Sequence, residues 1–228
     1  MEPDEKRLKK VDPSEFDDLN EALSFDLDPL QDIESETRRL ISTRKLRSDL
    51  KHRTLDARKR QELAEVMPAL PAPGECYHIV SNGHFDYWTW VPVMAGYLGR
   101  ADEYYGSTWT MNRHNVVDML DMIDRGLICR AAVVTGDYFK HREPAVYATL
   151  LRGFRRRGMR VACALNHTKV TLLANHERGD YLVLEGSANY TSNPRMEQNI
   201  ILNDQAVYRF HRDWLEEVIQ IGLEGNEN

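Results

Sequence analysis

From residue 75 onward, apolar runs of strand length alternate with amphipathic segments, and this alternation limits the folds open to the chain. The strand candidates are 77–81, 103–109, 129–135, 160–165, 168–173, 181–186 and 199–203. The helix candidates are 87–98, 115–124, 142–157 and 206–223. The order predicts an α/β domain with a mixed, partly parallel sheet flanked by helices.

Glycines and apolar stripes support these assignments. Gly99, Gly126 and Gly158 fall where three of the helices should end. The last helix candidate carries its apolar side chains on one face, namely Trp214, Val218, Ile219 and Leu223. About 150 residues are enough to bury a core of their own.

The first 66 residues have a different texture. Residues 1–32 are strongly acidic, whereas 33–66 are basic, contain neither Gly nor Pro, and favour a helix. The apolar stripe of this helix is thin, so we expect it to lie outside the main core. We predict a charged, partly helical extension over 1–66, a Pro-rich linker over 67–74 and a domain over 75–228. The extension is either a disordered tail or a helix that binds nucleic acid or a partner.

Composition narrows the classes of function. The net charge of −6 argues against a strongly basic nucleic-acid coat protein, although a local basic groove stays open. No apolar run approaches the ~18 residues of a membrane span, and the charged start predicts no signal peptide. The three cysteines Cys76, Cys129 and Cys163 lie in apolar stretches, which predicts buried thiols in a cytoplasmic protein.

Two polar pairs stand at the ends of neighbouring strand candidates. His167 and Lys169 are two residues apart, so in a strand both side chains point to the same face. A histidine beside an ammonium suits phosphate binding with a nucleophilic imidazole nearby. Ser187 and Asn189 form the second pair and can donate hydrogen bonds to phosphate oxygens. A hairpin over 168–187 brings the two pairs together.

This pattern resembles the phospholipase D superfamily, whose signature is His-x-Lys followed by Gly-Ser-x-Asn on a neighbouring strand. Here the motifs are His167-Thr168-Lys169 and Gly186-Ser187-Ala188-Asn189. Glu197 in Arg195-Met196-Glu197 is similar to the downstream acid that, in the family, hydrogen-bonds the catalytic histidine. The family also places an aspartate five positions after the lysine, and this chain has Ala174 there.

The resemblance implies a mechanism that needs no metal and no other cofactor. Active family members use two motif copies, and one copy here implies a symmetric homodimer with two facing His167 residues. One His167 attacks phosphorus, and its partner protonates the leaving oxygen and then activates water. Lys169, Ser187 and Asn189 stabilise the phosphoryl charge, and Glu197 orients an imidazole.

Other residues offer weaker signals. Asn82 and His84 follow the first strand candidate and are possible substrate contacts. In the same stretch, Tyr87, Trp88 and Trp90 either stack on bases or pack in the core. Arginines at the end of the 142–157 helix either complement its dipole or hold a polyanion near the site; they are Arg152, Arg155, Arg156 and Arg157. The remaining histidines show no metal-ligand spacing.

The sequence therefore favours a metal-independent phosphodiesterase, a nuclease that cuts DNA or another nucleic acid through a phosphohistidine. Two alternatives stay open. One is a domain that has kept the fold but lost the chemistry and serves as a binding scaffold. The other is a phosphodiesterase that processes phospholipids.

Overall fold

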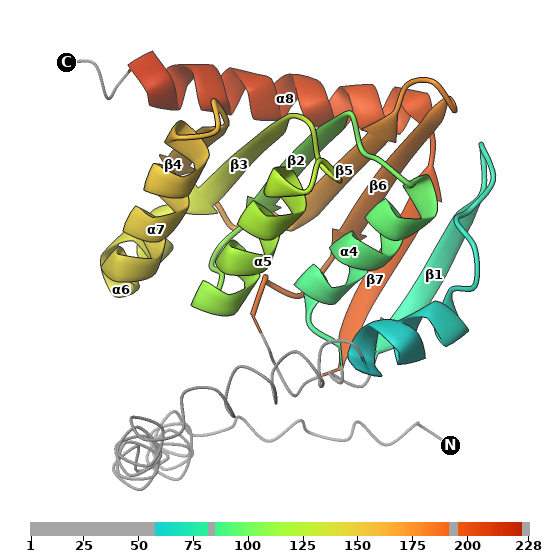
Figure 1. Ribbon diagram of the computed structural model, residues 1–228. Helices are drawn as coiled ribbons and strands as arrows, with labels where there is room; N and C mark the ends of the chain where they lie inside the picture. The colour runs from blue at the N-terminus through green and yellow to red at the C-terminus, as the bar shows by residue number, and fades with distance from the viewer. Residues whose placement is uncertain (1–57, 82–84, 192–195, 225–228) are drawn as a thin grey trace, which may run out of the picture. The chain divides into compact units, whose positions relative to one another are not determined.

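The computed structural model describes residues 58–81, 85–191 and 196–224, and a seven-stranded sheet is its central feature (Figure 1). The strands are β1 (Cys76–Ser81), β2 (Glu103–Thr108), β3 (Ala131–Gly136), β4 (Arg160–Ala164), β5 (Val170–Asn175), β6 (Asp180–Gly186) and β7 (Glu197–Asn203). Their order across the sheet is β1-β7-β6-β5-β2-β3-β4. β2, β3 and β4 pair in parallel, and every other pairing is antiparallel. The expected mixed, partly parallel sheet is confirmed.

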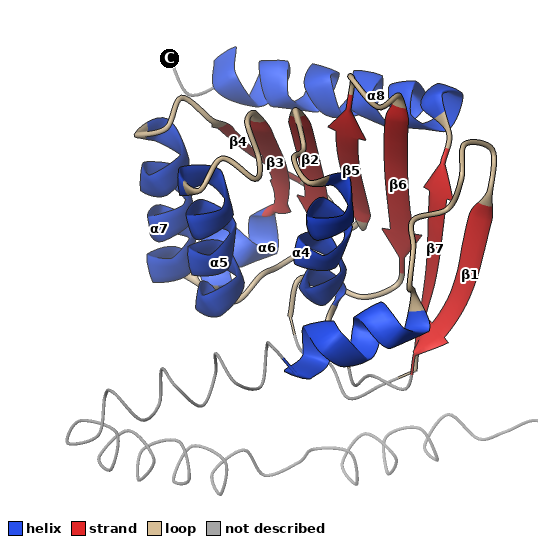
Figure 2. Cartoon of the chain, turned by 45° about the vertical axis from the view of Figure 1, so that its right-hand side comes forward, coloured by secondary structure: helices blue, strands red, loops and turns tan. Residues whose placement is uncertain are grey.

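Helices cover both faces of the sheet (Figure 2). On one face lie α4 (Tyr87–Leu98), α5 (Arg113–Asp124) and α7 (Pro144–Arg155), preceded by the short α6 (Asp137–Arg142). On the other face α8 (Gln205–Glu224) crosses the strands alone among the described helices. Apolar residues fill both interfaces, because the central strands are buried on their two sides.

The predicted helix over 142–157 corresponds to α7, and the shorter α6, which was not predicted, precedes it. Residues 137–142 form α6, the helical conformation is interrupted at Glu143, and α7 begins at Pro144. Proline disfavours the helical conformation of the residue before it, and Glu143 accordingly has φ −124° and ψ 56°. Proline is well suited to the first turn of the new helix, where its missing N–H has no partner to lose.

The other helix ends agree with the glycine signals. α4 ends at Gly99, whose φ of 74° lies in the left-handed region, and its N–H donates to the carbonyl of Gly96. Gly126 and Gly158 also have positive φ, just beyond α5 and α7. The predicted termini of these helices are therefore confirmed to within a few residues.

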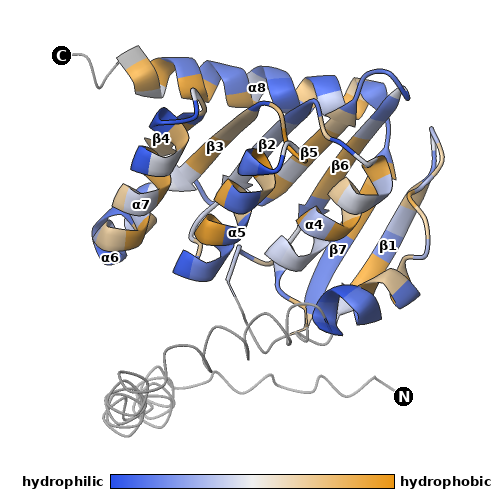
Figure 3. Ribbon diagram, viewed as in Figure 1, coloured by the Kyte–Doolittle hydropathy of each residue, from blue (hydrophilic) through white to orange (hydrophobic). Residues whose placement is uncertain are grey.

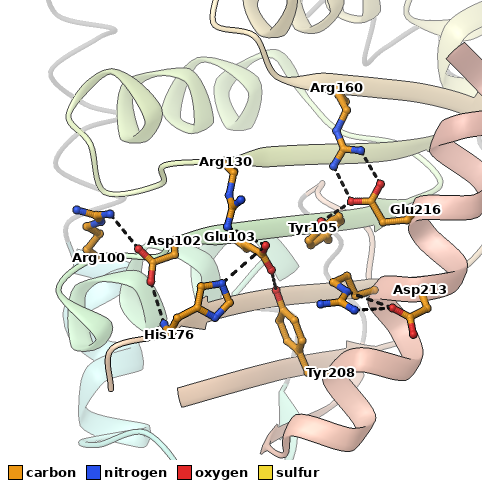
Figure 4. A network of polar contacts seen from close by, with 11 residues as sticks. Arg100, Asp102, Glu103, Tyr105, Arg130, Arg160, His176, Tyr208, Asp213 and Glu216 are labelled. Carbon is orange, nitrogen blue, oxygen red and sulfur yellow. Dashed lines mark hydrogen bonds and ion pairs between the residues drawn. The ribbon is translucent and has the colours of Figure 1, made fainter. Parts of the chain in front are cut away.

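α8 packs its apolar stripe on the sheet, and Figure 3 shows apolar and polar residues alternating along it. Ile219 is fully buried, and Trp214, Val218 and Leu223 pack against the same cluster, as expected. Polar contacts add to this packing (Figure 4). Glu216 accepts two hydrogen bonds from Arg160, at 2.5 and 2.6 Å, and one from the Tyr105 hydroxyl at 2.5 Å.

The helix at residues 58–66 is part of the core, contrary to the expectation for this stretch. Leu63 and Met67 are at most 1% exposed, and both belong to the apolar cluster that includes residues of α4. The chain divides between Arg53 and Thr54, so the compact unit that carries the sheet starts before residue 75. The thin apolar stripe of this helix led to the wrong prediction, because one leucine is sufficient to pack a helix into a core. The rest of the expected extension, residues 1–57, lies outside the described residues.

The thiol prediction is wrong in part. All three cysteines are free, but Cys76 is exposed and Cys129 and Cys163 are half-buried. Cys76 begins β1, which is an edge strand with alternate residues open to solvent. Within the described residues, no helix has both the length and the apolar character that crossing a membrane requires.

Candidate functional site

The strand directions bring both motifs to one edge of the sheet. β1, β2, β3, β4 and β6 run one way, whereas β5 and β7 run the other way. The first motif immediately precedes β5, the second follows from the end of β6, and Glu197 begins β7. All three therefore lie where the parallel strands end, the edge at which open α/β sheets bind ligands.

His167 and Lys169 lie just before β5 rather than within it, because the strand begins at Val170. Their side chains still meet. The Lys169 ammonium donates to His167 Nδ1 at 3.0 Å and to the His167 carbonyl at 2.6 Å. His167 is exposed, and the Lys169 side chain is half-buried. An imidazole and an ammonium in contact at an open edge can receive a phosphate.

The backbone around Lys169 is tied to the second motif. The Tyr87 hydroxyl lies 2.6 Å from the Leu184 carbonyl and 3.1 Å from the Lys169 carbonyl. Burial raises the pKa of Tyr87, which keeps this hydroxyl a donor. The Gly186 N–H donates to the Lys169 carbonyl at 3.3 Å. These bonds fix the spacing between the two motifs.

Position 186 of the second motif requires glycine, because its neighbours leave no room for a side chain. A Cβ at this position would lie 2.4 Å from Asn199 Oδ1, 2.7 Å from Tyr87 Cε2 and 3.0 Å from the Gln198 carbonyl. Two of these neighbours are buried and the third is backbone, so they cannot move aside easily. Glycine lets β6 approach β7 and α4 closely and so places the following serine.

Ser187 and Glu197 form a hydrogen-bonded pair at this edge. The Ser187 hydroxyl donates to Glu197 Oε2 and accepts from the Gln198 N–H at 3.1 Å. Glu197 is only 8% exposed, and its charge acts on Lys169. Burial lowers the pKa of Lys169, and Glu197 opposes that effect. The structure thus brings His167, Lys169, Ser187 and Glu197 together.

Asn189 follows Ser187 by two residues, in the segment after β6. Its Oδ1 is buried and has no hydrogen-bond partner within the described part of the chain. A buried amide oxygen without a partner is uncommon, and the Oδ1 of Asn199 shares this property. Beside the turn, a hollow of about 320 Å³ is lined by Glu185, Gly186, Ser187, Gln198 and Ile200.

Asn166, for which the sequence predicted no role, organises the first motif. Its Nδ2 donates to Ser107 Oγ at 3.0 Å, and its Oδ1 accepts from the Thr168 N–H at 2.9 Å and from the Thr168 hydroxyl at 2.7 Å. It therefore ties the loop that carries His167 to the end of β2. A polar residue directly before the motif was the available signal.

Trp109 is the second residue without an expected role. Its ring lies 5.4 Å from that of His167 and is stacked on Tyr138, 4.2 Å away and tilted by 18°. By contrast, Tyr87, Trp88 and Trp90 are buried to within 2%, so they pack in the core and do not stack on bases. Asn82 and His84 lie outside the described residues.

The arginine cluster does not flank the site. α7 starts near the edge of the sheet that carries both motifs, which we call the motif edge, and runs to the opposite edge. There the chain passes through Arg155, Arg156 and Arg157 before β4 begins. Arg157 is held by Asp124, with bonds of 2.6 and 2.5 Å, and donates to the Gly153 carbonyl. These contacts stabilise the end of the helix, which favours a structural role for Arg157 over the binding of a polyanion.

Ala174 occupies the position at which the resemblance places an aspartate. It is fully buried near the far end of β5, among the residues under α8. At about 3.3 Å per residue, five residues of strand separate it from Lys169 by roughly 16 Å. A side chain at position 174 therefore does not reach Lys169.

No family model matches the sequence, and no curated protein does. Solved structures do match, among them the following three. Nuc from Salmonella typhimurium, a phospholipase D family member, has 13% identity and a TM-score of 0.46 over 63% of this chain and 94% of its own. Polyphosphate kinase from Porphyromonas gingivalis has 13% identity and a TM-score of 0.47 over 62% of this chain and 25% of its own. Phosphatidylserine synthase from Haemophilus influenzae has 10% identity and a TM-score of 0.43 over 64% of this chain and 39% of its own.

Likenesses of this size carry no argument about what the chain binds or does. The fold rests on the strand pairing and helix packing described above. The mixed, partly parallel sheet with flanking helices, and with both motifs at one edge, agrees with the α/β arrangement that the sequence predicts.

Proposed function

From this phospholipase-D-like domain we propose a metal-independent phosphodiesterase, most specifically a nuclease acting on DNA or another nucleic acid. The observation that carries the proposal is the contact between the Lys169 ammonium and His167 Nδ1, 3.0 Å apart at an open edge. The buried Glu197 and the exposed Ser187 stand at the same edge. This set supplies a nucleophile, a cation and a hydroxyl for one phosphate.

The Lys169 contact also implies an order of events. While the ammonium donates to Nδ1, a neutral His167 carries its proton on Nε2 and is not nucleophilic there. A phosphate oxygen competes for the ammonium and releases Nδ1, which then takes the proton. Nε2 becomes free to attack phosphorus, forming a P–N bond as the P–O bond to the leaving group breaks. Water then cleaves the phosphohistidine.

The leaving oxygen needs a proton donor, and a second His167 from a partner subunit provides it in our proposal. The motif edge suits such an arrangement because His167 is exposed there. Apolar side chains at the same edge are also open to solvent, namely Val80 at 75%, Leu165 at 98% and Met196 at 82%. They lie at the ends of β1 and β4 and the start of β7, so a partner can cover them.

The first test is cutting of single- and double-stranded DNA in excess EDTA. We expect wild-type protein to cut and His167→Ala to lose roughly 10³-fold or more of the rate, since it removes both nucleophile and acid. His176→Ala is the matched control, because His176 follows the opposite end of β5.

Each other outcome counts against the proposal in its own way. Cutting by wild type only when a divalent cation is added contradicts the metal-independent mechanism. Equal cutting by wild type and His167→Ala places the activity elsewhere. Cutting of a phospholipid but of no nucleic acid contradicts the nuclease assignment and keeps His167 as the nucleophile.

A further inference from the structure

Two aromatic side chains extend the motif edge away from His167. Trp109 follows β2 directly, and Tyr138 lies in the first turn of α6. Their rings stack at 4.2 Å with an angle of 18°, and Trp109 in turn contacts His167 at 5.4 Å. Tyr138 is 45% exposed although one of its faces is covered by Trp109, so its other face is open. The rings of Tyr138 and His167 are therefore one indole apart.

Neighbouring residues hold this pair in place. A Cβ on Gly136 would lie 2.6 Å from Trp109 Cδ1 and 2.7 Å from the Trp109 carbonyl, so glycine makes room for the indole across the end of β3. Asn166 Nδ2 contacts Ser107 Oγ at 3.0 Å and the Thr108 carbonyl at 3.3 Å, which links the loop of His167 to the loop of Trp109. The ring positions relative to His167 are thus fixed by the fold.

Two exposed cations share the short helix of Tyr138. The last turn of α6 carries Lys140 and Arg142, whereas the acids Asp137 and Glu143 stand at the two ends of the helix, with His141 lying 3.3 Å from Asp137. A ligand that suits this surface is flat, so that it can stack on Tyr138, and it carries negative charge beside the flat part. A nucleotide has both properties.

We propose that Trp109 and Tyr138 form a stacking platform for the base next to the scissile phosphate, so that the substrate is a single strand at that position. This inference rests on the proposed phosphodiesterase function and names its substrate class. In a duplex both faces of a base are covered by its neighbours, and no face is left for Tyr138. An unpaired strand can place a phosphate on His167 and a base on Tyr138 together.

Binding is the decisive measurement, and it is made separately from cutting. The background is His167→Ala in EDTA, which keeps the substrate intact, with a labelled single-stranded oligonucleotide and fluorescence anisotropy. Tyr138→Ala should raise Kd by roughly 5- to 150-fold, the usual loss for one stacked base. Tyr138→Phe keeps the ring and should leave Kd unchanged. Phe210→Ala is the matched control, because Phe210 is 68% exposed but lies on α8.

A second oligonucleotide identifies the stacked base. One abasic position is moved along the strand, and at one position next to the scissile phosphate Kd should rise as it does in Tyr138→Ala. In Tyr138→Ala itself that abasic position should have no further effect, since the partner of the base is already gone. Circular dichroism melting confirms that each variant is folded.

Three results overturn the platform. Duplex bound as tightly as single strand overturns it, as does an abasic penalty that persists in Tyr138→Ala. In either case, metal-free cutting by wild type leaves the proposed phosphodiesterase intact. Binding to phosphatidylglycerol vesicles but to no oligonucleotide overturns the platform and the nuclease assignment together.

Discussion

A contact at His167 joins the imidazole to the ammonium of Lys169. The Lys169 ammonium donates to Nδ1, and the same ammonium is the cation that we expect to neutralise phosphoryl charge. Lys169 is half-buried, and desolvation lowers its pKa, while the nearby Glu197 raises it and so limits the shift. The positive charge of Lys169 is thus held by a balance between burial and one carboxylate.

This balance predicts the alkaline limb of the pH profile. Raising the pH deprotonates Lys169, and a neutral amine no longer stabilises the phosphoryl oxygens, so kcat/KM should fall. Because burial lowers the pKa of Lys169, the fall should begin below the ordinary lysine value of 10.5. Lys169→Arg keeps its charge to above pH ~12, so its profile should lose this limb even if its rate is lower. An unchanged limb in Lys169→Arg assigns the titration to another group.

At the scale of elements, both apolar and polar contacts connect the helix at residues 58–66 to the domain. Leu63 is fully buried in the apolar cluster that includes residues of α4. Asp118 on α5 accepts from Arg60 at 2.5 Å and from Trp88 Nε1 at 2.7 Å, which joins three helices through one carboxylate. This helix is therefore a structural part of the domain.

Leu63→Ala should accordingly lower the free energy of unfolding by about 2–5 kcal/mol, the usual cost of removing a buried leucine side chain. Val66→Ala is the comparison, because Val66 ends the same helix but is 58% exposed, and it should change stability by less than about 0.5 kcal/mol. Urea denaturation measures both values. Equal effects of the two substitutions would show that the helix does not depend on Leu63 for docking.

At the scale of the whole molecule, the proposed site depends on the pairing of two chains. One copy of the His-x-Lys motif is present in the sequence, and the proposed mechanism needs two imidazoles. The three exposed apolar residues at the motif edge span the sheet from one edge strand to the other, and only a broad partner surface covers them all. A two-fold axis through this edge would bring the two His167 side chains face to face.

Mixing of subunits tests this pairing. Wild-type and His167→Ala chains are co-expressed in equal amounts with different tags, and total activity is measured. If each site uses both histidines, random pairing leaves about one quarter of the dimers active. If each chain carries a complete site, half of the activity remains. Sedimentation should give a species of twice the 26.5 kDa chain mass.

Much of the site was predictable because its residues are local in the sequence. The pairs His167/Lys169 and Ser187/Asn189 flank one continuous hairpin, β5–β6, so the chain itself brings them to the same edge. Asn166, Trp109 and Tyr138 were not predictable in the same way. They come from three different connections, and only the pairing of β2, β3 and β4 places them side by side.

By itself the sequence determined the alternation of strands and helices, the helix ends at glycines and the two motifs, because these depend on neighbouring residues and on backbone conformation. The tertiary structure decided what depends on distant partners. It buried Leu63 in the core, placed the α7 arginines at the far edge, and fixed the pairing of Ser187 with Glu197. It also set Tyr138 on Trp109 beside His167, because packing across a sheet joins residues that the chain keeps far apart.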